Sequence, residues 1–281
     1  MAVTEQRTIE VDDGAHIAYE VRSDQPSGLP ILALHGVLVG TSNWIHQMLR
    51  LPQFNWIAPA IRGHGDSSPA GEEPSIERAA LDALEVLDAE GIDRAVVIGN
   101  SLGATVGLAL ALLRPERVIA LVLAEPSVPQ LLPNRGGDRL SSAAERARPL
   151  LEAGRIDDAL DIFLTPRVGA DWRHKVGRRR LAEWRKNVLS TPAWFTAVEA
   201  FNPGPGPLAA LDLPVLIVYG ANTQPEYRDL TMAVADAVPS AEVAVVPDAG
   251  HGSPADNPEA FNTLLVEFLK ELGVVASGAR P

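Results

Sequence analysis

The chain has 281 residues, 46% of them hydrophobic, and a formal net charge of −12. This length fits one large α/β domain, or a domain that carries an insertion. The acidic balance, without a basic stripe, argues against binding to nucleic acid, and no apolar stretch is long enough to span a membrane. The densest basic run, Arg173–Lys175 with Arg178–Arg180, is predicted to be a solvated helix face.

Cysteine is absent. Disulfides, thiolate catalysis and cysteine-based metal sites are therefore excluded, and the composition is compatible with a reducing compartment. The segment Met1–Arg7 has no basic stretch followed by an apolar one. We therefore expect no secretory signal and a cytoplasmic location.

Strands are predicted where apolar, β-branched runs stand between turn signals. The first two strands flank Asp12–Ala15, whose Asp-Gly pair is typical of a hairpin turn. Ser75 is the expected N-cap of an amphipathic helix that ends at Glu90, before Gly91. The strands expected in this half are Thr8–Val11, His16–Val21, Pro30–Leu34, Asn55–Ala60, a run from Ala95, and Val118–Ala124.

From about Ser127 to Pro207 no strand pattern appears, and Pro and Gly separate several helical patterns. The alternation of strands and helices then resumes. Alternation of this kind predicts a mostly parallel sheet covered on both faces, here interrupted by a helical insertion. The last expected elements are the strands Pro214–Tyr219 and Glu242–Val246 and the helices Glu226–Val238 and Asn257–Leu272.

The segment Gly99-Asn100-Ser101-Leu102-Gly103 joins an expected strand to an expected helix, Ala104–Leu113. Gly-x-Ser-x-Gly in this setting is typical of a nucleophile elbow, a sharp turn that exposes a serine. The glycines let the backbone and the helix crowd the turn without a Cβ clash. Ser101 is then predicted at the helix N-terminus, where the dipole favours developing negative charge. The alternative is a structural serine in a glycine-rich turn.

Four motifs, in this order, make the chain resemble the α/β-hydrolase superfamily over nearly its whole length: His35-Gly36, Arg62–Ser67, Gly99–Gly103 and Gly250-His251. The resemblance implies an α/β fold with a mostly parallel eight-stranded sheet, flanked by helices, and a helical cap inserted after strand six. It implies a core made of residues 1–126 and 208–281 and a cap made of residues 127–207. It also implies a serine hydrolase of the esterase or lactonase type.

A serine nucleophile needs a general base within hydrogen-bond reach. The resemblance implies that His251, in the loop after the last strand, is this base. His35 and His64 are the alternatives, although in this superfamily both usually shape loops. The acid departs from the commonest pattern, because the loop after strand seven has Asn222 and Thr223 where most relatives carry Asp.

Glu125 follows strand six directly and is the expected acid, since a carboxylate there can orient His251. A structural carboxylate at the hinge of the cap is the alternative for Glu125, and Glu226 and Asp248 are the other candidate acids. This Ser-His-Glu arrangement is similar to that of zearalenone lactonases, although other esterases share it.

The expected oxyanion hole consists of the backbone N–H groups of Leu102 and Val37, with Leu38 as the alternative to Val37. Aromatic residues of the cap suggest an apolar substrate, with a macrocycle or an aromatic ring among the candidates. Packing within the cap is the alternative interpretation of these residues. The expected substrate-binding residues are Leu38, Trp184, Trp194, Phe195 and Phe201.

We therefore expect a cofactor-independent serine hydrolase, without a metal, that cleaves a small apolar ester or lactone through an acyl-enzyme. Two alternatives stay open. Gly99–Gly103 and Phe261-Asn262 resemble hydrolases that break a carbon–carbon bond in ring-cleavage products. Asn222 in the usual acid loop keeps open a non-catalytic ligand-binding protein. No nucleic-acid or membrane partner is expected, and a homodimer is an open alternative to a monomer.

Overall fold

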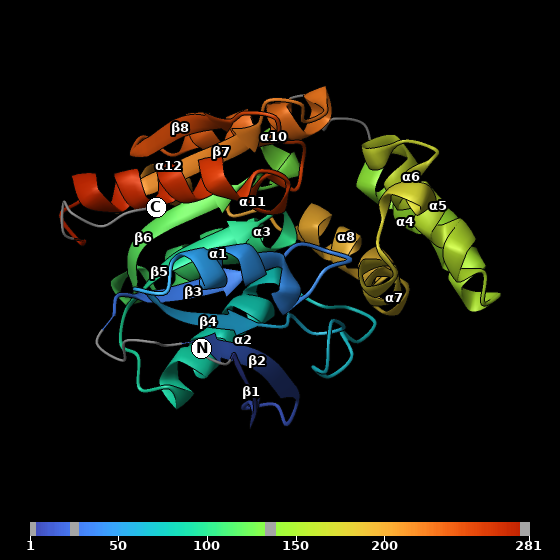
Figure 1. Cartoon of the computed structure of the whole chain (residues 1–281), viewed down its shortest axis with the longest axis horizontal. Helices are drawn as coiled ribbons and strands as arrows, with labels where there is room; N and C mark the ends of the chain where they lie inside the picture. The colour runs from blue at the N-terminus through green and yellow to red at the C-terminus, as the bar shows by residue number, and fades with distance from the viewer. Residues whose placement is uncertain (1–3, 23–27, 133–138, 276–281) are drawn as a thin grey trace.

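The computed structural model describes residues 4–22, 28–132 and 139–275. Its strands are β1 (Glu5–Glu10), β2 (His16–Arg22), β3 (Pro30–Leu34), β4 (Asn55–Pro59), β5 (Ala95–Asn100), β6 (Val118–Ala124), β7 (Val215–Gly220) and β8 (Ala241–Val246). They form one eight-stranded sheet in the order β1-β2-β4-β3-β5-β6-β7-β8 (Figure 1). Strands β3 to β8 pair in parallel, whereas β2 pairs antiparallel with β1 and β4. The predicted mostly parallel sheet is confirmed.

The α-helices are α1 (Ile45–Arg50), α2 (Ile76–Ala89), α3 (Leu102–Leu113), α4 (Arg139–Glu152), α5 (Ile156–Val168), α6 (Trp172–Lys175), α7 (Arg178–Asn187), α8 (Thr191–Ala200), α9 (Pro205–Ala209), α10 (Pro225–Ala237), α11 (Ser253–Asp256) and α12 (Pro258–Glu271). Short 3-10 helices cover Thr41–Trp44, Pro115–Arg117 and Pro129–Leu131. The predicted cap of Ser75 on α2 is present, because its side chain accepts a hydrogen bond from the Arg78 N–H. The sequence did not predict the short helices α1 and α11.

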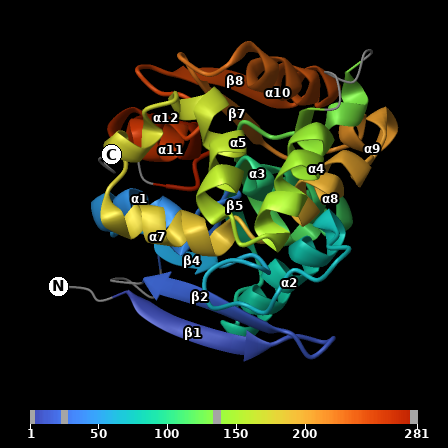
Figure 2. The ribbon, with the colours of Figure 1, turned by 90° about the vertical axis from the view of Figure 1, so that its right-hand side faces the viewer.

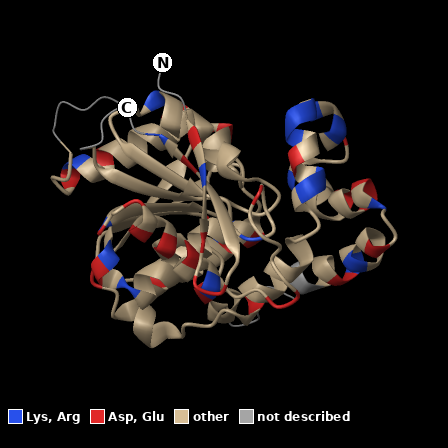
Figure 3. Ribbon diagram, turned by 90° about the horizontal axis from the view of Figure 1, so that it is seen from below, with Lys and Arg blue, Asp and Glu red and all other residues tan. Residues whose placement is uncertain are grey.

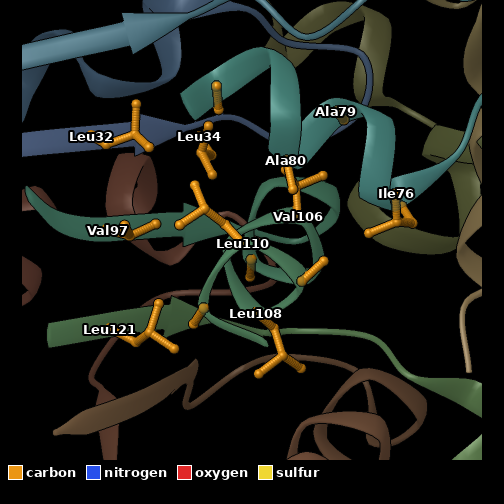
Figure 4. Packing of buried hydrophobic residues seen from close by; sticks show 14 of the residues in the cluster. Leu32, Leu34, Ile76, Ala79, Ala80, Val97, Val106, Leu108, Leu110 and Leu121 are labelled. Carbon is orange, nitrogen blue, oxygen red and sulfur yellow. The ribbon is translucent and has the colours of Figure 1, made fainter. Parts of the chain in front are cut away.

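The central strands are buried on both faces, and their side chains alternate between two cores. Ile31 and Ala33 of β3 pack with α1 and α12, whereas Leu32 and Leu34 pack with α2, α3 and α10. Figure 4 shows the second of these cores, in which α3 lies across β3, β5 and β6. The period-2 alternation therefore explains why the central strands read as continuous apolar runs.

The helices α4 to α8 follow β6 and precede β7, as the resemblance implied. Figures 1 and 2 show α4 to α7 beyond one end of the sheet. We call α4 to α8 the helical insertion. It has a hydrophobic core of its own around Phe163, Trp172 and Phe195, and α8 joins it to the main core through Trp194 and Phe201. Residue 207, the predicted end of the cap, lies inside helix α9.

Lys and Arg residues gather on the insertion (Figure 3). Most residues of the basic run are exposed, and two of them pair with acids nearby: Arg173 with Asp161, and Lys175 with Asp171. The basic run is therefore a solvated face, as expected. Among the residues that the structure describes, no helix is both long and apolar enough to cross a membrane.

Candidate active site

Ser101 stands in the tight turn between β5 and α3, with φ 54° and ψ −116°. A Cβ on Gly103 would lie 2.1 Å from the carbonyl oxygen of Leu34, and one on Gly99 would lie 2.4 Å from the Gly103 oxygen. Contacts this short with backbone atoms cannot be relieved by a rotamer change. Glycine is therefore required at both positions, and the turn has the geometry of the predicted elbow.

His251 lies in the loop after β8, and its ring reaches the serine. Its Nε2 is 3.0 Å from the Ser101 hydroxyl oxygen, and its Nδ1 is 2.5 Å from Oε2 of Glu125. The side-chain amide of Asn100 donates a hydrogen bond to the His251 carbonyl oxygen at 3.2 Å. The elbow therefore also holds the backbone of the histidine loop.

Glu125 follows β6 with a left-handed backbone, φ 52°, and only 2% of it is exposed. Its Oε1 accepts a hydrogen bond from the Gly220 N–H at 3.0 Å, and its Oε2 accepts one from the Thr223 hydroxyl at 2.8 Å. The loop after β7 therefore contributes hydrogen-bond donors to the carboxylate of Glu125. These hydrogen bonds fix the position of the buried carboxylate beside the His251 ring.

The other candidate acids lie elsewhere in the structure. Glu226 belongs to the lining of a pocket, described below, and Asp248 is exposed, with φ 53°. Of the carboxylates that the sequence singled out, Glu125 is the one that the structure places in hydrogen-bond contact with His251.

His35 and His64 are both buried, with ring centroids 4.8 Å apart. His35 Nε2 accepts a hydrogen bond from the Ile61 N–H at 2.9 Å, and its Nδ1 lies 2.8 Å from the Gly36 oxygen. His64 Nδ1 lies 3.2 Å from the carbonyl oxygens of Ile61 and Arg62. Burial lowers the pKa of His35 to about 3 and that of His64 to about 4. Both rings are therefore neutral at pH 7 and brace the loops after β3 and β4.

The loop after β3 passes directly beside the elbow. A Cβ on Gly36 would be 3.4 Å from the Ser101 Cβ, and the next two residues are Val37 and Leu38. Leu102 is the first residue of α3, so its N–H has no partner within the helix. The structure thus places both predicted oxyanion-hole segments, Val37–Leu38 and Leu102, beside Ser101 at the carboxyl ends of β3 and β5.

A pocket of about 410 Å³ lies between the insertion and α10. Tyr227 lines it and also stacks on the His251 ring, with centroids 4.0 Å apart and planes at 27°. The pocket wall therefore reaches the histidine that contacts Ser101. The lining residues are Pro129, Leu132, Ser142, Ala143, Arg146, Ile162, Phe163, Pro166, Arg167, Phe195, Glu199, Gln224, Glu226, Tyr227, Asp229 and Leu230.

The structure separates the predicted substrate-binding residues into three groups. Phe195 lines the pocket. Leu38 and Trp184 pack in or against the core of the insertion. Trp194 and Phe201 pack in the main core, and the Trp194 Nε1–H donates to the Arg62 carbonyl oxygen at 2.9 Å. A pattern of aromatic residues alone does not distinguish a core position from a pocket position.

Sequence reasoning missed Tyr227 and Arg167. The guanidinium carbon of Arg167, on α5, is 5.2 Å from the Tyr227 ring centroid, and its Nε donates to the Tyr227 hydroxyl. Nearby, the Gln224 side chain donates to the Pro166 carbonyl oxygen. An aromatic residue early in the helix after strand seven was the available signal. Over the described part of the chain, no group of three or more His, Asp or Glu side chains could hold a metal ion.

Residues 31–264 match the model of the alpha/beta hydrolase family, and the chain belongs to this family. It is 27% identical over 274 residues to the 2-hydroxymuconate semialdehyde hydrolase of Pseudomonas sp. (strain CF600), covering 90% of this chain and 91% of that protein. A hydrolase structure from Pseudomonas aeruginosa PA01 has a TM-score of 0.81 and 25% identity, covering 94% of this chain and 98% of that one. Est816, described as an N-acyl homoserine lactone degrading enzyme, has a TM-score of 0.71 and 29% identity, covering 93% and 100%.

Proposed function

We propose that this hydrolase cleaves a carboxylic ester or lactone of an apolar substrate, with Ser101 as the nucleophile. The observation that carries the proposal is the continuous contact from the Ser101 hydroxyl to His251 Nε2, at 3.0 Å, and from His251 Nδ1 to Glu125, at 2.5 Å. A nucleophile, a base and a buried acid in this order are the requirements for activating a serine.

The proposed reaction has two halves. Ser101 Oγ attacks the carbonyl carbon while its proton passes to His251 Nε2, and the tetrahedral oxyanion accepts hydrogen bonds from the Leu102 and Val37 N–H groups. The intermediate collapses to the acyl-enzyme, and His251 gives its proton to the departing alkoxide. Water then attacks the acyl carbon, losing a proton to His251, and the acid leaves as Ser101 recovers its proton.

Glu125 is proposed to hold the Nδ1–H of His251 and to stabilise the imidazolium form. Its own position is held by the Gly220 and Thr223 donors, so that the carboxylate does not turn away from the ring. This arrangement takes the place of an Asp after β7, where the chain has Asn222.

The pocket supports an apolar substrate. Ile162, Phe163, Phe195 and Leu230 line it, beside the Tyr227 ring that stacks on His251. Apolar walls with a few polar groups are typical of sites for small organic ligands. The lactone-degrading activity in the description of Est816 makes lactones the first cyclic esters to test.

A carbon–carbon bond hydrolase is the second candidate, favoured by the 27% identity to 2-hydroxymuconate semialdehyde hydrolase. The same nucleophile and base would serve it, so the two candidates differ in the substrate that the pocket accepts. A ligand-binding protein without turnover is the third reading, and an activated Ser101 would exclude it.

The test is to incubate the protein with a fluorophosphonate probe and to measure turnover of aryl esters, lactones and ring-cleavage products. We expect probe on Ser101 by mass spectrometry and hydrolysis of esters or lactones, both lost in Ser101→Ala. Turnover of the ring-cleavage products alone would favour the second candidate. A wild-type protein that is neither labelled nor active would contradict the proposal.

Glu125→Gln tests the acid separately. We expect the rate to fall about 10³- to 10⁴-fold, because the amide cannot stabilise the imidazolium. Asp248→Asn is the matched control, since it removes an exposed carboxylate from the loop of His251 and should leave the rate within about 2-fold. Equal rates in Glu125→Gln and the wild type would reject Glu125 as the acid.

A further inference from the structure

The end of helix α7, in the insertion, contacts the loop that follows β3. The Asn187 side-chain amide donates to the Leu38 carbonyl oxygen at 3.0 Å, and its Oδ1 accepts from the Gly65 N–H at 3.3 Å. One turn earlier, Glu183 Oε1 accepts from the Gly40 N–H at 3.0 Å and from the Ser42 hydroxyl at 2.7 Å. These four hydrogen bonds are among those that tie helix α7 of the insertion to the core.

The loop needs such support. Leu38 has φ 68°, a left-handed conformation that costs a residue with a Cβ about 1–2 kcal/mol. Asn187 is 1% exposed, and both ends of its amide are hydrogen-bonded. A buried amide that is hydrogen-bonded at both ends and donates to the carbonyl of a strained residue restricts the peptide groups on either side of that residue.

We infer that Asn187 is a positioning residue for the oxyanion hole, holding through Leu38 the loop that carries the Val37 N–H. The inference rests on the proposed function. Oxyanion donors act in the transition state and must stand at hydrogen-bond distance from where the charge develops. A loop released from Asn187 should therefore lower kcat more than it changes KM.

The experiment compares Asn187→Ala and Asn187→Asp with the wild type. The aspartate keeps the shape of the side chain but turns an acceptor toward the Leu38 oxygen. We expect kcat for an aryl ester to fall roughly 10²-fold, the effect typical of a misplacement of about 1 Å, with KM within about 3-fold. Phenylboronic acid bonds its boron to the serine oxygen and presents a boronate oxygen to the hole, so its inhibition constant should rise by a similar factor.

Ser190→Ala is the matched control. Ser190 lies on the same junction between α7 and α8, and its hydroxyl is 3.1 Å from the Gly63 carbonyl oxygen and 3.0 Å from the Asn187 carbonyl oxygen. Ser190→Ala therefore disturbs the backbone at Asn187 but leaves the Asn187 side-chain amide and its bond to Leu38 in place. The loss of the Ser190 hydroxyl should lower the melting temperature while kcat and the boronate inhibition constant stay within about 2-fold of the wild type.

Two outcomes would overturn the inference, and they are distinguishable. If the Asn187 variants melt earlier but keep wild-type kcat and boronate inhibition, Asn187 only stabilises the fold, and the proposed function stands. If the wild type itself neither hydrolyses the ester nor reacts with the fluorophosphonate, the proposed function fails and the inference fails with it.

Discussion

The elbow that carries Ser101 and the helical insertion are held in place by different contacts. At the elbow, backbone meets backbone, so that a Cβ on Gly103 would lie 2.1 Å from the Leu34 oxygen. The insertion is attached by the packing of α8 on the main core and by side chains that donate to loop carbonyls, such as Asn187 to Leu38 and Trp194 to Arg62. At the elbow, close backbone contacts exclude any side chain on Gly103. A hydrogen bond from the insertion contributes only about 1 kcal/mol to stability. The core therefore sets the position of Ser101, and side chains of the insertion contact the loops after β3 and β4.

The largest effect should follow from breaking the elbow. Gly103→Ala places a Cβ against both the oxygen and the carbon of Leu34, at 2.1 and 2.4 Å, so β3 and α3 must move apart. We expect the free energy of unfolding to fall by about 4 kcal/mol and Ser101 labelling to be lost. Urea denaturation and fluorophosphonate labelling measure the two effects.

Gly206→Ala is the control for this change. Gly206 lies within α9, and a Cβ there would have no atom within 4 Å. The substitution should leave labelling unchanged and raise stability by about 0.4–1 kcal/mol, because alanine restricts the unfolded chain. Equal stability of the two variants would show that the elbow tolerates a Cβ.

The same difference explains what could be predicted from the sequence. The strands, the start of α2 and the elbow can be predicted from short stretches of sequence. Apolar runs indicate the strands, Ser75 indicates the start of the helix, and the paired glycines Gly99 and Gly103 indicate the elbow. The contact of Glu125 with His251 is expected from its place directly after strand six together with the family resemblance, because some branches of the fold place their acid at this strand end. Asn187 could not be predicted, because its partner Leu38 is 149 residues away and its neighbours are the charged residues of an exposed helix.

The aromatic residues of the insertion show a second limit. Trp194 and Phe195 are adjacent, yet one packs in the main core and the other lines the pocket. Burial and ligand contact demand the same apolar rings. Phe195 has both environments, since it packs in the core of the insertion and also lines the pocket. The three-dimensional arrangement, and not the sequence, shows which rings reach the pocket.

The loops after β3 and β4, between the elbow and the insertion, should respond to pH. The folded protein holds the pKa of His64 at about 4, below the ordinary value of about 6.5. As the pH falls below 6.5, the unfolded chain takes up a proton that the folded chain excludes, so stability falls until the pH reaches the folded-state pKa. We expect His64 to contribute a loss of about 1.6 kcal/mol between pH 6.5 and 5, measured by urea denaturation.

His64→Gln should remove that part of the pH dependence, leaving the part due to His35, whose pKa is also lowered by burial. His46→Gln, which changes an exposed histidine on α1, should reproduce the wild-type slope. If His64→Gln and the wild type lost stability equally over this range, protonation of His64 would not limit the stability of the two loops.

The smallest effect concerns Tyr227 of α10. Its ring lies between the His251 ring of the core and the Arg167 guanidinium of the insertion. The His251 ring packs on Tyr227, and Arg167 of α5 covers the tyrosine. Tyr227→Leu removes the flat surface that holds the histidine ring, a contact worth about 1.4 kcal/mol or tenfold in rate. We therefore expect kcat, and the rate at which a small fluorophosphonate labels Ser101, to fall about tenfold.

Two further variants separate this role from substrate binding. Tyr227→Phe keeps the ring and loses only the hydroxyl that Arg167 contacts, so labelling should stay within about 3-fold of the wild type. Leu230→Ala changes another residue of α10 that lines the same pocket, and it should raise KM without slowing the labelling. If Tyr227→Leu were labelled at the wild-type rate, the stack on Tyr227 would not orient His251, and the insertion would not act on the base through Arg167 and Tyr227.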